Sequence, residues 1–218
     1  METLAKIEAL IEERHLLTHP FYTKWVAGKI PPTAIREYAR RYYHFEAAFP
    51  RFLSAIHTRI EDAADRLIVL DNLWDEEHGK ENHVELWLRF AEGVGTDRAD
   101  VRAGAPSPAT TRLVESYATA TSSSAAGGVA AVYAYERQVP AVAAAKIAGL
   151  QEHYGIDDDR TLAFWRVHQR LDEEHADGER TLLEQMADRD PAAAVGATEA
   201  ALDAWWGFLD EVDADAAA

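Results

Sequence analysis

Three side chains that can bind metal follow one another at helical spacing toward the end of the chain. His168, Asp172 and His175 are separated by four and then three residues. At about 100° per residue, an α-helix projects all three within a sector of roughly 60°. The rest of that face is apolar, and an ionised group there is costly unless it is paired or coordinated. The spacing therefore predicts that the three side chains converge on one buried site.

Other apolar helix faces also contain single acidic residues or histidines. Glu136 lies on an otherwise apolar stripe near Val132, His83 opens the face that continues through Trp87, and Glu76 sits at the end of another apolar face. Any one of these residues alone is more often hydrogen-bonded than metal-bound. Together they form a buried charge without an obvious basic partner, which favours a metal site. Carboxylates and imidazoles from several helices are the donors with which helical bundles hold paired iron or manganese ions.

The spacing of Glu76 and His83 presents a geometric problem. The two residues are seven apart, which separates them by about 10 Å along an ideal helix. One ion cannot easily bind both across that distance. Either the helix is interrupted near Gly79, which brings His83 round, or the two residues serve different ions of a pair.

A rival assignment comes from a repeated tetrapeptide. Asp-Glu-Glu-His occurs at 75–78 and again at 172–175. In this interpretation Asp75 or Glu76 would act together with His78. Spacing alone leaves both assignments open.

Composition narrows the class of protein. The chain has 218 residues, 48% of them hydrophobic, which suits a single domain spanning 1–218. With 22 basic and 38 acidic residues the net charge is −16, which disfavours nucleic acid and anionic membranes as partners. No apolar run could span a bilayer and no secretory signal is recognisable, so a cytoplasmic location is expected. The absence of cysteine excludes thiolate ligands and nucleophiles.

Helical periodicity dominates the chain, and the expected fold is an all-α bundle. Pro50 should kink or break the third helix. The region 93–108 is expected to be the longest connection, and 213–218 a frayed end. The expected helices cover residues 3–19, 21–27, 33–59, 62–78, 82–92, 109–121, 128–154, 160–187 and 191–212.

The order Glu-x6-His, a lone Glu, then His-x3-Asp-x2-His resembles the heme-oxygenase-like diiron oxidases over nearly the whole chain. The likeness is greatest to the branch of the chlamydial protein associating with death domains, which forms 4-aminobenzoate for folate biosynthesis. The resemblance implies a heme-oxygenase-like bundle with a buried dinuclear site, Fe/Fe or Fe/Mn, that uses O2 and an external reductant. It favours His83 over His78. The implied ligands are Glu76, His83, Glu136, His168, Asp172 and His175.

The same resemblance implies an unusual substrate. Tyr22 matches a tyrosine that supplies the aromatic ring itself, and Lys146 matches a lysine implicated as the amine donor. Tyr135 also matches a tyrosine of that branch, whereas Phe164 stands where a further tyrosine is expected. From the residues alone, Tyr22 could be ordinary core, and Lys146 could lie along the surface with its ammonium in water.

Other functions remain open at this level. The same metal site could oxidise an external small substrate such as an amino or fatty acid, or the chain could be a non-enzymatic helical interaction or regulatory protein. The segment 19–22 and the run 41–43 also resemble pyrroloquinoline-quinone synthase and thiaminase II. The first of these works without metal, and the second needs a cysteine nucleophile that this chain lacks. The oligomeric state is open, with a homodimer as one option.

Overall fold

Helices form almost all of the regular structure in the computed structural model, which describes residues 2–216. The predicted all-α class is confirmed. In chain order the elements are α1 (Glu2–Glu13), the 3₁₀ turn η1 (Leu16–Thr18), α2 (Pro20–Val26), α3 (Pro32–Glu46), α4 (Phe49–His57), α5 (Ala63–Glu77), α6 (His83–Gly93), α7 (Arg98–Ala103), α8 (Pro108–Ser123), α9 (Ala125–Glu136), α10 (Val139–Tyr154), α11 (Asp159–Met186) and α12 (Pro191–Ala216).

Polar side chains fix where several of these helices begin. Asp62, Asn82, Ser124 and Asp158 accept hydrogen bonds from backbone amides in the first turns of α5, α6, α9 and α11. Such caps satisfy amides that have no partner inside the helix. They therefore set the start of the four helices that carry the predicted ligands.

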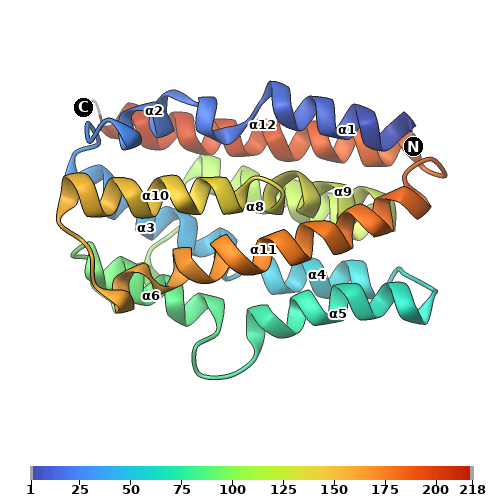
Figure 1. The fold of residues 1–218 in the computed structure, drawn as a ribbon, viewed down its shortest axis with the longest axis horizontal. Helices are drawn as coiled ribbons and strands as arrows, with labels where there is room; N and C mark the ends of the chain where they lie inside the picture. Colours follow the sequence, from blue (N-terminus) through green and yellow to red (C-terminus); the bar gives the residue numbers. More distant parts are fainter. Residues whose placement is uncertain (1, 217–218) are drawn as a thin grey trace.

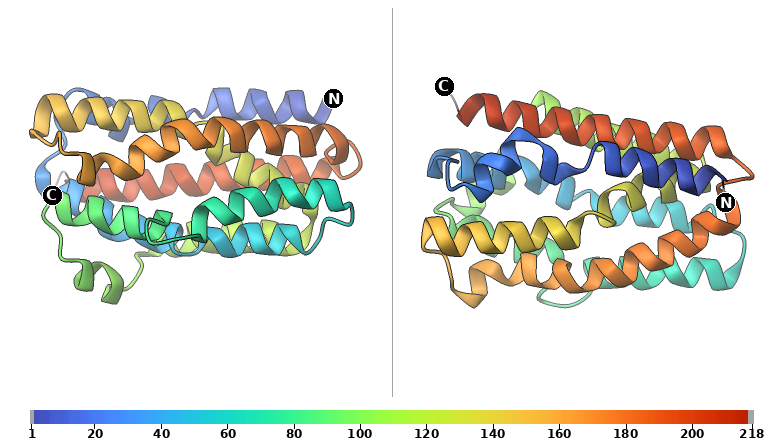
Figure 2. Two further views of the ribbon diagram at one scale, coloured as in Figure 1. Left: turned by 60° about the horizontal axis from the view of Figure 1, so that its bottom comes forward. Right: turned by 45° about the horizontal axis from the view of Figure 1, so that its top comes forward.

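The helices run roughly along one common axis. In Figure 1, α1 and α12 lie along one long edge, α5 and α6 along the opposite edge, and α9, α10 and α11 between them. Figure 2 shows from two further directions that the long helices run roughly along this axis. α9 packs against α12, α11 and α8, and every residue from Ala126 to Glu136 is buried. α9 is thus the central helix, and any charge on it lies inside the protein.

Pro50 breaks the helix predicted over 33–59, as expected. α3 ends at Glu46 and α4 begins at Phe49, with Pro50 in its first turn. A proline has no amide hydrogen to donate and is tolerated only in the first turn of a helix. The break makes Glu46 the last residue of α3.

The single helix predicted over 128–154 is wrong. α9 ends at Glu136 and α10 begins at Val139. Pro140 is the physical reason, because its ring clashes with the carbonyl four residues earlier and it cannot donate the helical hydrogen bond. Glu136 consequently ends the central helix, while Lys146 lies on a separate one.

Three other boundaries differ from expectation. The predicted connection over 93–108 contains α7, which Asp97 caps. The first helix ends at Glu13 rather than near residue 19, since η1 intervenes. Residues 213–216, predicted to fray, are part of α12, and the last two residues of that prediction lie outside the described part of the chain.

The two longest helices, α11 and α12, include charged residues. Within residues 2–216, no helix combines the length and the apolar character needed to cross a lipid bilayer.

Candidate metal centre

α11 presents its three predicted ligands to the interior. His168, Asp172 and His175 are all at least nine-tenths buried, and His175 Nδ1 lies 3.8 Å from Asp172 Oδ1. His168 Nδ1 lies 2.8 Å from the carbonyl oxygen of Phe164. A carbonyl can only accept, so Nδ1 carries the proton and Nε2 keeps its lone pair. The hydrogen bond to the Phe164 carbonyl therefore leaves His168 Nε2 available for a metal ion.

His175 is oriented in a comparable way. Its Nε2 lies 3.2 Å from Oδ2 of Asp75 on α5, while its Nδ1 has no hydrogen-bond partner among the described residues. Metal-binding histidines commonly donate one ring N–H to a carboxylate or carbonyl and bind the metal with the other nitrogen. Both histidines of α11 therefore have the arrangement that metal binding requires.

The chain between α5 and α6 brings Glu76 and His83 together. α5 ends at Glu77, α6 begins at His83, and Gly79 has a φ of +84°, a left-handed conformation that favours glycine. The turn places His83 Nδ1 2.8 Å from Glu76 Oε1, and the His83 ring centroid 4.4 Å from that of His168. The interruption expected near Gly79 is present, and the seven-residue spacing is no obstacle.

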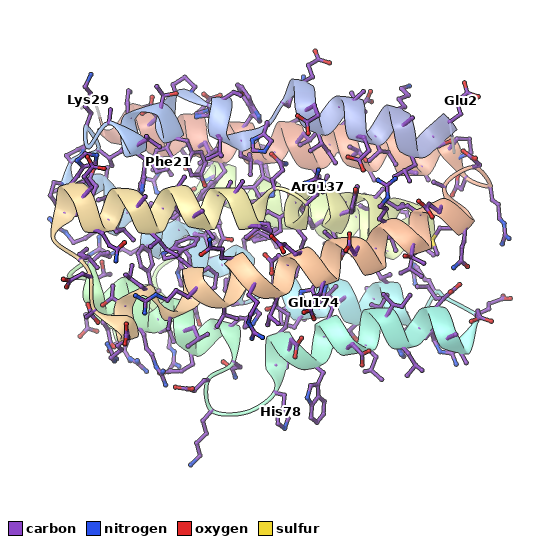
Figure 3. All side chains as sticks on the ribbon, in the orientation of Figure 1. Glu2, Phe21, Lys29, His78, Arg137 and Glu174 are labelled. Carbon is purple, nitrogen blue, oxygen red and sulfur yellow. The ribbon has the colours of Figure 1, made fainter. Side chains whose placement is uncertain are left out.

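His78, the rival candidate, lies outside the cluster. It is exposed and stacks on Trp74, with 3.9 Å between the ring centroids. Figure 3 shows it at the edge of the molecule, pointing away from the helices. Of the two histidines, His83 is the one that faces the other candidate ligands.

Glu136 reaches the same region from the end of α9. Its two carboxylate oxygens each accept a hydrogen bond of 3.1 Å from Asn72 Nδ2. Asn72 is buried on α5, one turn before Glu76. Burial raises the pKa of Glu136, while His175 and the Asn72 hydrogen bonds oppose that rise. Asn72, which the sequence did not single out, thus positions a candidate ligand.

Sequence reasoning also missed two carboxylates in this cluster. Glu46 at the end of α3 is 3% exposed, and Glu179 on α11 is 5% exposed. Glu179 follows His175 by four residues and continues the ligand face of α11. Glu46 follows Tyr42 by four on the buried face of α3. A search for acidic residues on every apolar stripe would have found both.

The electrostatics of the cluster are those of crowded acids. Burial, followed by the neighbouring carboxylates, raises the pKa values of Glu46, Asp172 and Glu179 well above their usual range. Burial, followed by the proximity of His83, lowers the pKa of His168 well below 6.5. Burial acts to lower the pKa of His83 as well, but the adjacent Glu76 outweighs it and raises that pKa. A multivalent cation would relieve this repulsion.

Several polar atoms of the cluster fit such a cation. Within residues 2–216, four carboxylate oxygens of the cluster are buried without a hydrogen-bond partner: Glu46 Oε1, Glu76 Oε2, Asp172 Oδ2 and Glu179 Oε2. Unsatisfied buried carboxylate oxygens are rare in folded proteins unless an ion or water completes them. Oxygen and imidazole donors suit iron and manganese, so the residues present fit these metals.

A second cluster surrounds Lys146. This side chain is fully buried on α10, and Nζ has no hydrogen-bond partner among the described residues. Nζ lies 3.7 Å from the ring centroid of Tyr38, 4.4 Å from Trp25, 4.6 Å from Trp165 and 5.0 Å from Tyr22. Burial lowers the pKa of Lys146 well below 10.5. The alternative of a lysine lying along the surface is wrong.

Tyrosines link the two clusters. Tyr22 is buried and hydrogen-bonds to Tyr38, and burial raises its pKa. Tyr38 packs against Tyr42 with 5.5 Å between ring centroids, and the Tyr42 hydroxyl contacts that of Tyr135. Tyr135 immediately precedes Glu136. Of the two tyrosines that the resemblance singled out, Tyr22 thus lies in the lysine cluster and Tyr135 at the boundary of the carboxylate cluster.

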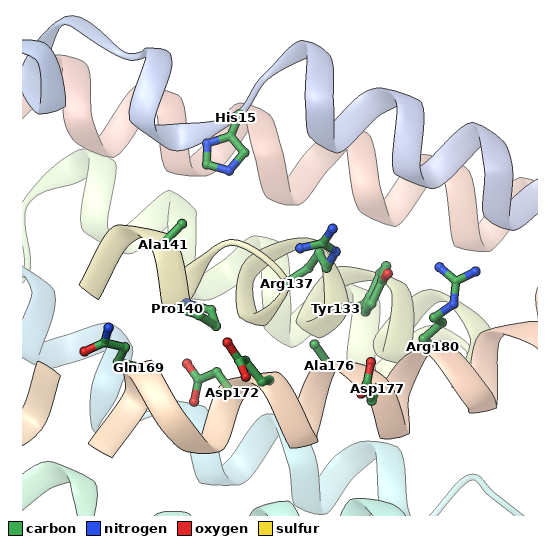
Figure 4. A pocket seen from close by; sticks show the side chains of 11 residues that line it. His15, Tyr133, Arg137, Pro140, Ala141, Gln169, Asp172, Ala176, Asp177 and Arg180 are labelled. Atoms are coloured by element: carbon green, nitrogen blue, oxygen red, sulfur yellow. The ribbon is translucent and has the colours of Figure 1, made fainter. Parts of the chain in front are cut away.

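A surface pocket of about 700 Å³ reaches the carboxylate cluster beside the break between α9 and α10. Asp172 forms part of its wall, together with Tyr133, Arg137 and Arg180 (Figure 4). The pocket therefore offers a route from solvent to one of the candidate ligands.

Comparison with known proteins gives a consistent family. The family model described as iron-containing redox enzyme matches residues 36–206, which include all six predicted ligands. A 4-aminobenzoate synthase of Chlamydia muridarum is 38% identical over 211 residues, covering 96% of this chain and 89% of the relative. A pyrroloquinoline-quinone synthase of Rhizobium meliloti is 30% identical over 213 residues, covering 94% and 82%.

The fold agrees with these matches. A domain of unknown function from Shewanella denitrificans, described as having a heme oxygenase-like fold, superposes with a TM-score of 0.80 at 18% identity. The match covers 98% of this chain and 91% of that one. The chain therefore belongs to the heme-oxygenase-like family of iron-containing redox enzymes.

Proposed function

We propose that this protein is a 4-aminobenzoate synthase of the self-sacrificing kind. The Tyr22 side chain would supply the aromatic ring and Lys146 the amino nitrogen, at a centre of two metal ions, Fe/Fe or Fe/Mn. The name of the Chlamydia muridarum relative supports the product, and the cluster described above supports the centre. The proposed ligands are Glu76, His83, Glu136, His168, Asp172 and His175.

The observation that carries the proposal is the meeting of Tyr22 and Lys146. They come from α2 and α10, 124 positions apart in the chain, yet Nζ lies 5.0 Å from the Tyr22 ring centroid. Both side chains are buried, and Nζ has no hydrogen-bond partner within residues 2–216. A lysine is seldom buried in this way without a partner or a function. Ring and amine are therefore held together away from water.

The lowered pKa of Lys146 suits an amine donor. A nitrogen must carry a lone pair to form a new bond to carbon, and burial extends the pH range over which this amine is neutral. The surrounding rings exclude water from it. Tyr135, at the edge of the carboxylate cluster, would connect the two regions through Tyr42.

The metal ions would supply the oxidative chemistry when bound, by activating O2 with electrons from an external reductant. The chain's own part is to orient the ligands. The Phe164 carbonyl and Asp75 fix the rings of His168 and His175, and Asn72 holds Glu136.

Isotope labelling tests the source of the ring. Protein produced with ring-labelled tyrosine should, after loading with Fe²⁺ and Mn²⁺, reduction and exposure to O2, release labelled 4-aminobenzoate detectable by mass spectrometry. We expect no more than one product molecule per chain. Tyr22→Phe should reduce the yield at least about 100-fold, since a phenol and a phenyl ring differ in their capacity for oxidation.

Tyr43→Phe is the matched control, because Tyr43 is half-buried on α3 and takes no part in either cluster. Its yield should stay near that of the unaltered chain. Release of labelled product from Tyr22→Phe at the normal yield would show that Tyr22 is not the substrate.

An external small substrate is the second candidate. The pocket beside Asp172 is large enough for an amino acid or another small acid to approach the cluster from solvent. Under this alternative the loaded protein would turn over many times with an added substrate and would not consume its own tyrosine. Intact-chain mass spectrometry after reaction separates the two candidates, because only the self-sacrificing reaction alters the mass at Tyr22 and Lys146.

A further inference from the structure

Glu46 is a buried carboxylate that the family's ligand pattern does not include. It is the last residue of α3, a helix that supplies none of the six expected ligands. Tyr38, Tyr42 and Glu46 follow at intervals of four and so share one face of that helix. The face begins in the aromatic cluster around Lys146 and ends in the carboxylate cluster.

Glu46 lies close to two of the candidate ligands. One potential ligand atom from each of Glu46, His83 and His168 can be chosen so that all three lie within 4.8 Å of one another. All three residues are buried, and they come from α3, α6 and α11. Donor atoms about 2.0–2.2 Å from a shared ion lie at most about 4 Å apart, so little movement would bring these atoms into coordination.

An unpaired carboxylate oxygen of Glu46 also favours metal binding. Its Oε1 is buried and has no hydrogen-bond partner among the described residues. His168 already donates Nδ1–H to the Phe164 carbonyl, which leaves its other nitrogen for an ion. Nothing else described near Oε1 satisfies it.

We propose that Glu46 is an additional carboxylate ligand, bound to the ion that His83 and His168 hold. The ion would be a divalent iron or manganese, for which one carboxylate and two imidazoles are suitable donors. This inference rests on the part of the proposed function that places metal ions in the cluster. It adds a ligand from α3, whereas the expected six lie on α5, α6, α9 and α11.

A charge effect must be separated from coordination, because removing any buried negative charge weakens cation binding. Glu179 provides the matched comparison. It has the same side chain, is 5% exposed against 3% for Glu46, and also has a raised pKa caused first by burial. Its Oε1 lies 3.5 Å from Asn72 Nδ2, and its Oε2, like Glu46 Oε1, has no hydrogen-bond partner among the described residues. The difference is that Glu179 is not a member of the group that Glu46 forms with the two histidines.

Titration of the metal-free chain with Mn²⁺ alone tests the proposal. The EPR signal of free aqueous Mn²⁺ gives the concentration of unbound ion, and elemental analysis of the desalted protein gives the number retained. Glu46→Gln should lose one bound ion or weaken its binding at least about tenfold. Glu179→Gln removes the same charge without removing a proposed donor, so it should weaken binding by a clearly smaller factor and keep the full number of bound ions. Circular dichroism of the metal-free variants establishes that each is folded.

Glu46→Asp provides a second variant of lower structural risk. It keeps the charge but withdraws the oxygens by one methylene, so it should also weaken the same ion at least about tenfold if Glu46 coordinates it. Two ions bound by Glu46→Gln with unchanged affinity would overturn the proposal, as would equal weakening in Glu46→Gln and Glu179→Gln. No Mn²⁺ bound by the unaltered chain would instead remove the metal centre of the proposed function itself.

Discussion

The interior holds two polar clusters that solve the problem of buried charge in opposite ways. Around His168, carboxylates and imidazoles crowd together, and three of the acids have strongly raised pKa values. Around Lys146, a single amine is enclosed by aromatic rings and has a lowered pKa. One cluster has an excess of acceptors and the other a lone donor. α3 and α11 contribute to both.

The difference indicates a division of labour. Crowded acids are costly in a metal-free interior and become favourable when a cation binds, so the first cluster is suited to the metal ions that we propose. A solitary amine among rings gains only the attraction of ring faces for a cation, about 0.5–2 kcal/mol. Burial outweighs that attraction and favours the neutral form. The second cluster is therefore suited to holding a reactive amine rather than a charge.

Removing one residue from each cluster should separate their roles. His168→Ala deletes a proposed ligand, and we expect both metal content and 4-aminobenzoate yield to fall, the latter at least about 100-fold. Lys146→Met deletes the amine and should lower the yield to the same extent while metal content stays normal. Elemental analysis and mass spectrometry of the same samples measure both quantities.

Lys29→Met is the control for lysine replacement, since Lys29 is exposed. Its yield and metal content should match those of the unaltered chain. Loss of metal from Lys146→Met would contradict the division into two clusters.

The two clusters should also give stability opposite dependences on pH. The folded-state pKa of Lys146 lies below its unfolded value near 10.5, so the unfolded chain binds more protons between them. The free energy of unfolding should then rise with pH, by up to about 1.4 kcal/mol per unit, until the pH reaches the unfolded pKa. Lys146→Met removes a buried unsatisfied donor and should stabilise the chain by about 1–3 kcal/mol at pH 7, an advantage that shrinks toward pH 10.5.

The buried carboxylates should make the free energy of unfolding decrease, rather than increase, with rising pH. The folded-state pKa values of Glu46 and Asp172 are raised, so the folded metal-free chain binds more protons and loses this stability as pH rises through those values. Asp172→Asn removes one of these titrating groups, so the free energy of unfolding of the metal-free variant should decrease less steeply as pH rises. Urea unfolding of the metal-free variants between pH 5 and pH 9, a range chosen to span about two units either side of neutrality, measures both slopes. A stability advantage of Lys146→Met that did not shrink with rising pH would contradict this account of the lysine.

Much of the fold was predictable because helix signals are local. The caps at Asp62 and Asn82 and the break at Pro50 follow from single residues and their neighbours. The break at Pro140 was predictable from the same rule, but the apolar run around it resembled one continuous buried helix. α9 is buried on all sides, so periodicity carries no information about where it ends.

The site was less accessible from the sequence. The α11 residues were identified because their spacing places them on one helix face. The contact between Glu76 and His83 depends on the turn at Gly79, whose shape no periodicity describes. Glu46 lies 30 positions before Glu76, and only the packing of α3 against α6 brings it near His83. Contacts between helices of this kind are not encoded in any local pattern.

Phe164 allows the smallest and most specific test of how the clusters communicate. It lies between them, 4.0 Å from the ring centroid of His168 and 4.8 Å from that of Trp165, and it stands where the related branch is expected to have a tyrosine. The contact between the Tyr42 and Tyr135 hydroxyls already joins the two regions on another path. We therefore expect Phe164→Tyr to change the yield of 4-aminobenzoate by no more than about twofold. Phe164 is buried in a packed interior, so the added hydroxyl should lower stability by about 1–3 kcal/mol through overpacking. Tyr135→Phe, which removes a hydroxyl from the existing path, should have the larger effect on yield. A severalfold gain in Phe164→Tyr would show instead that the missing hydroxyl limits the reaction in this chain.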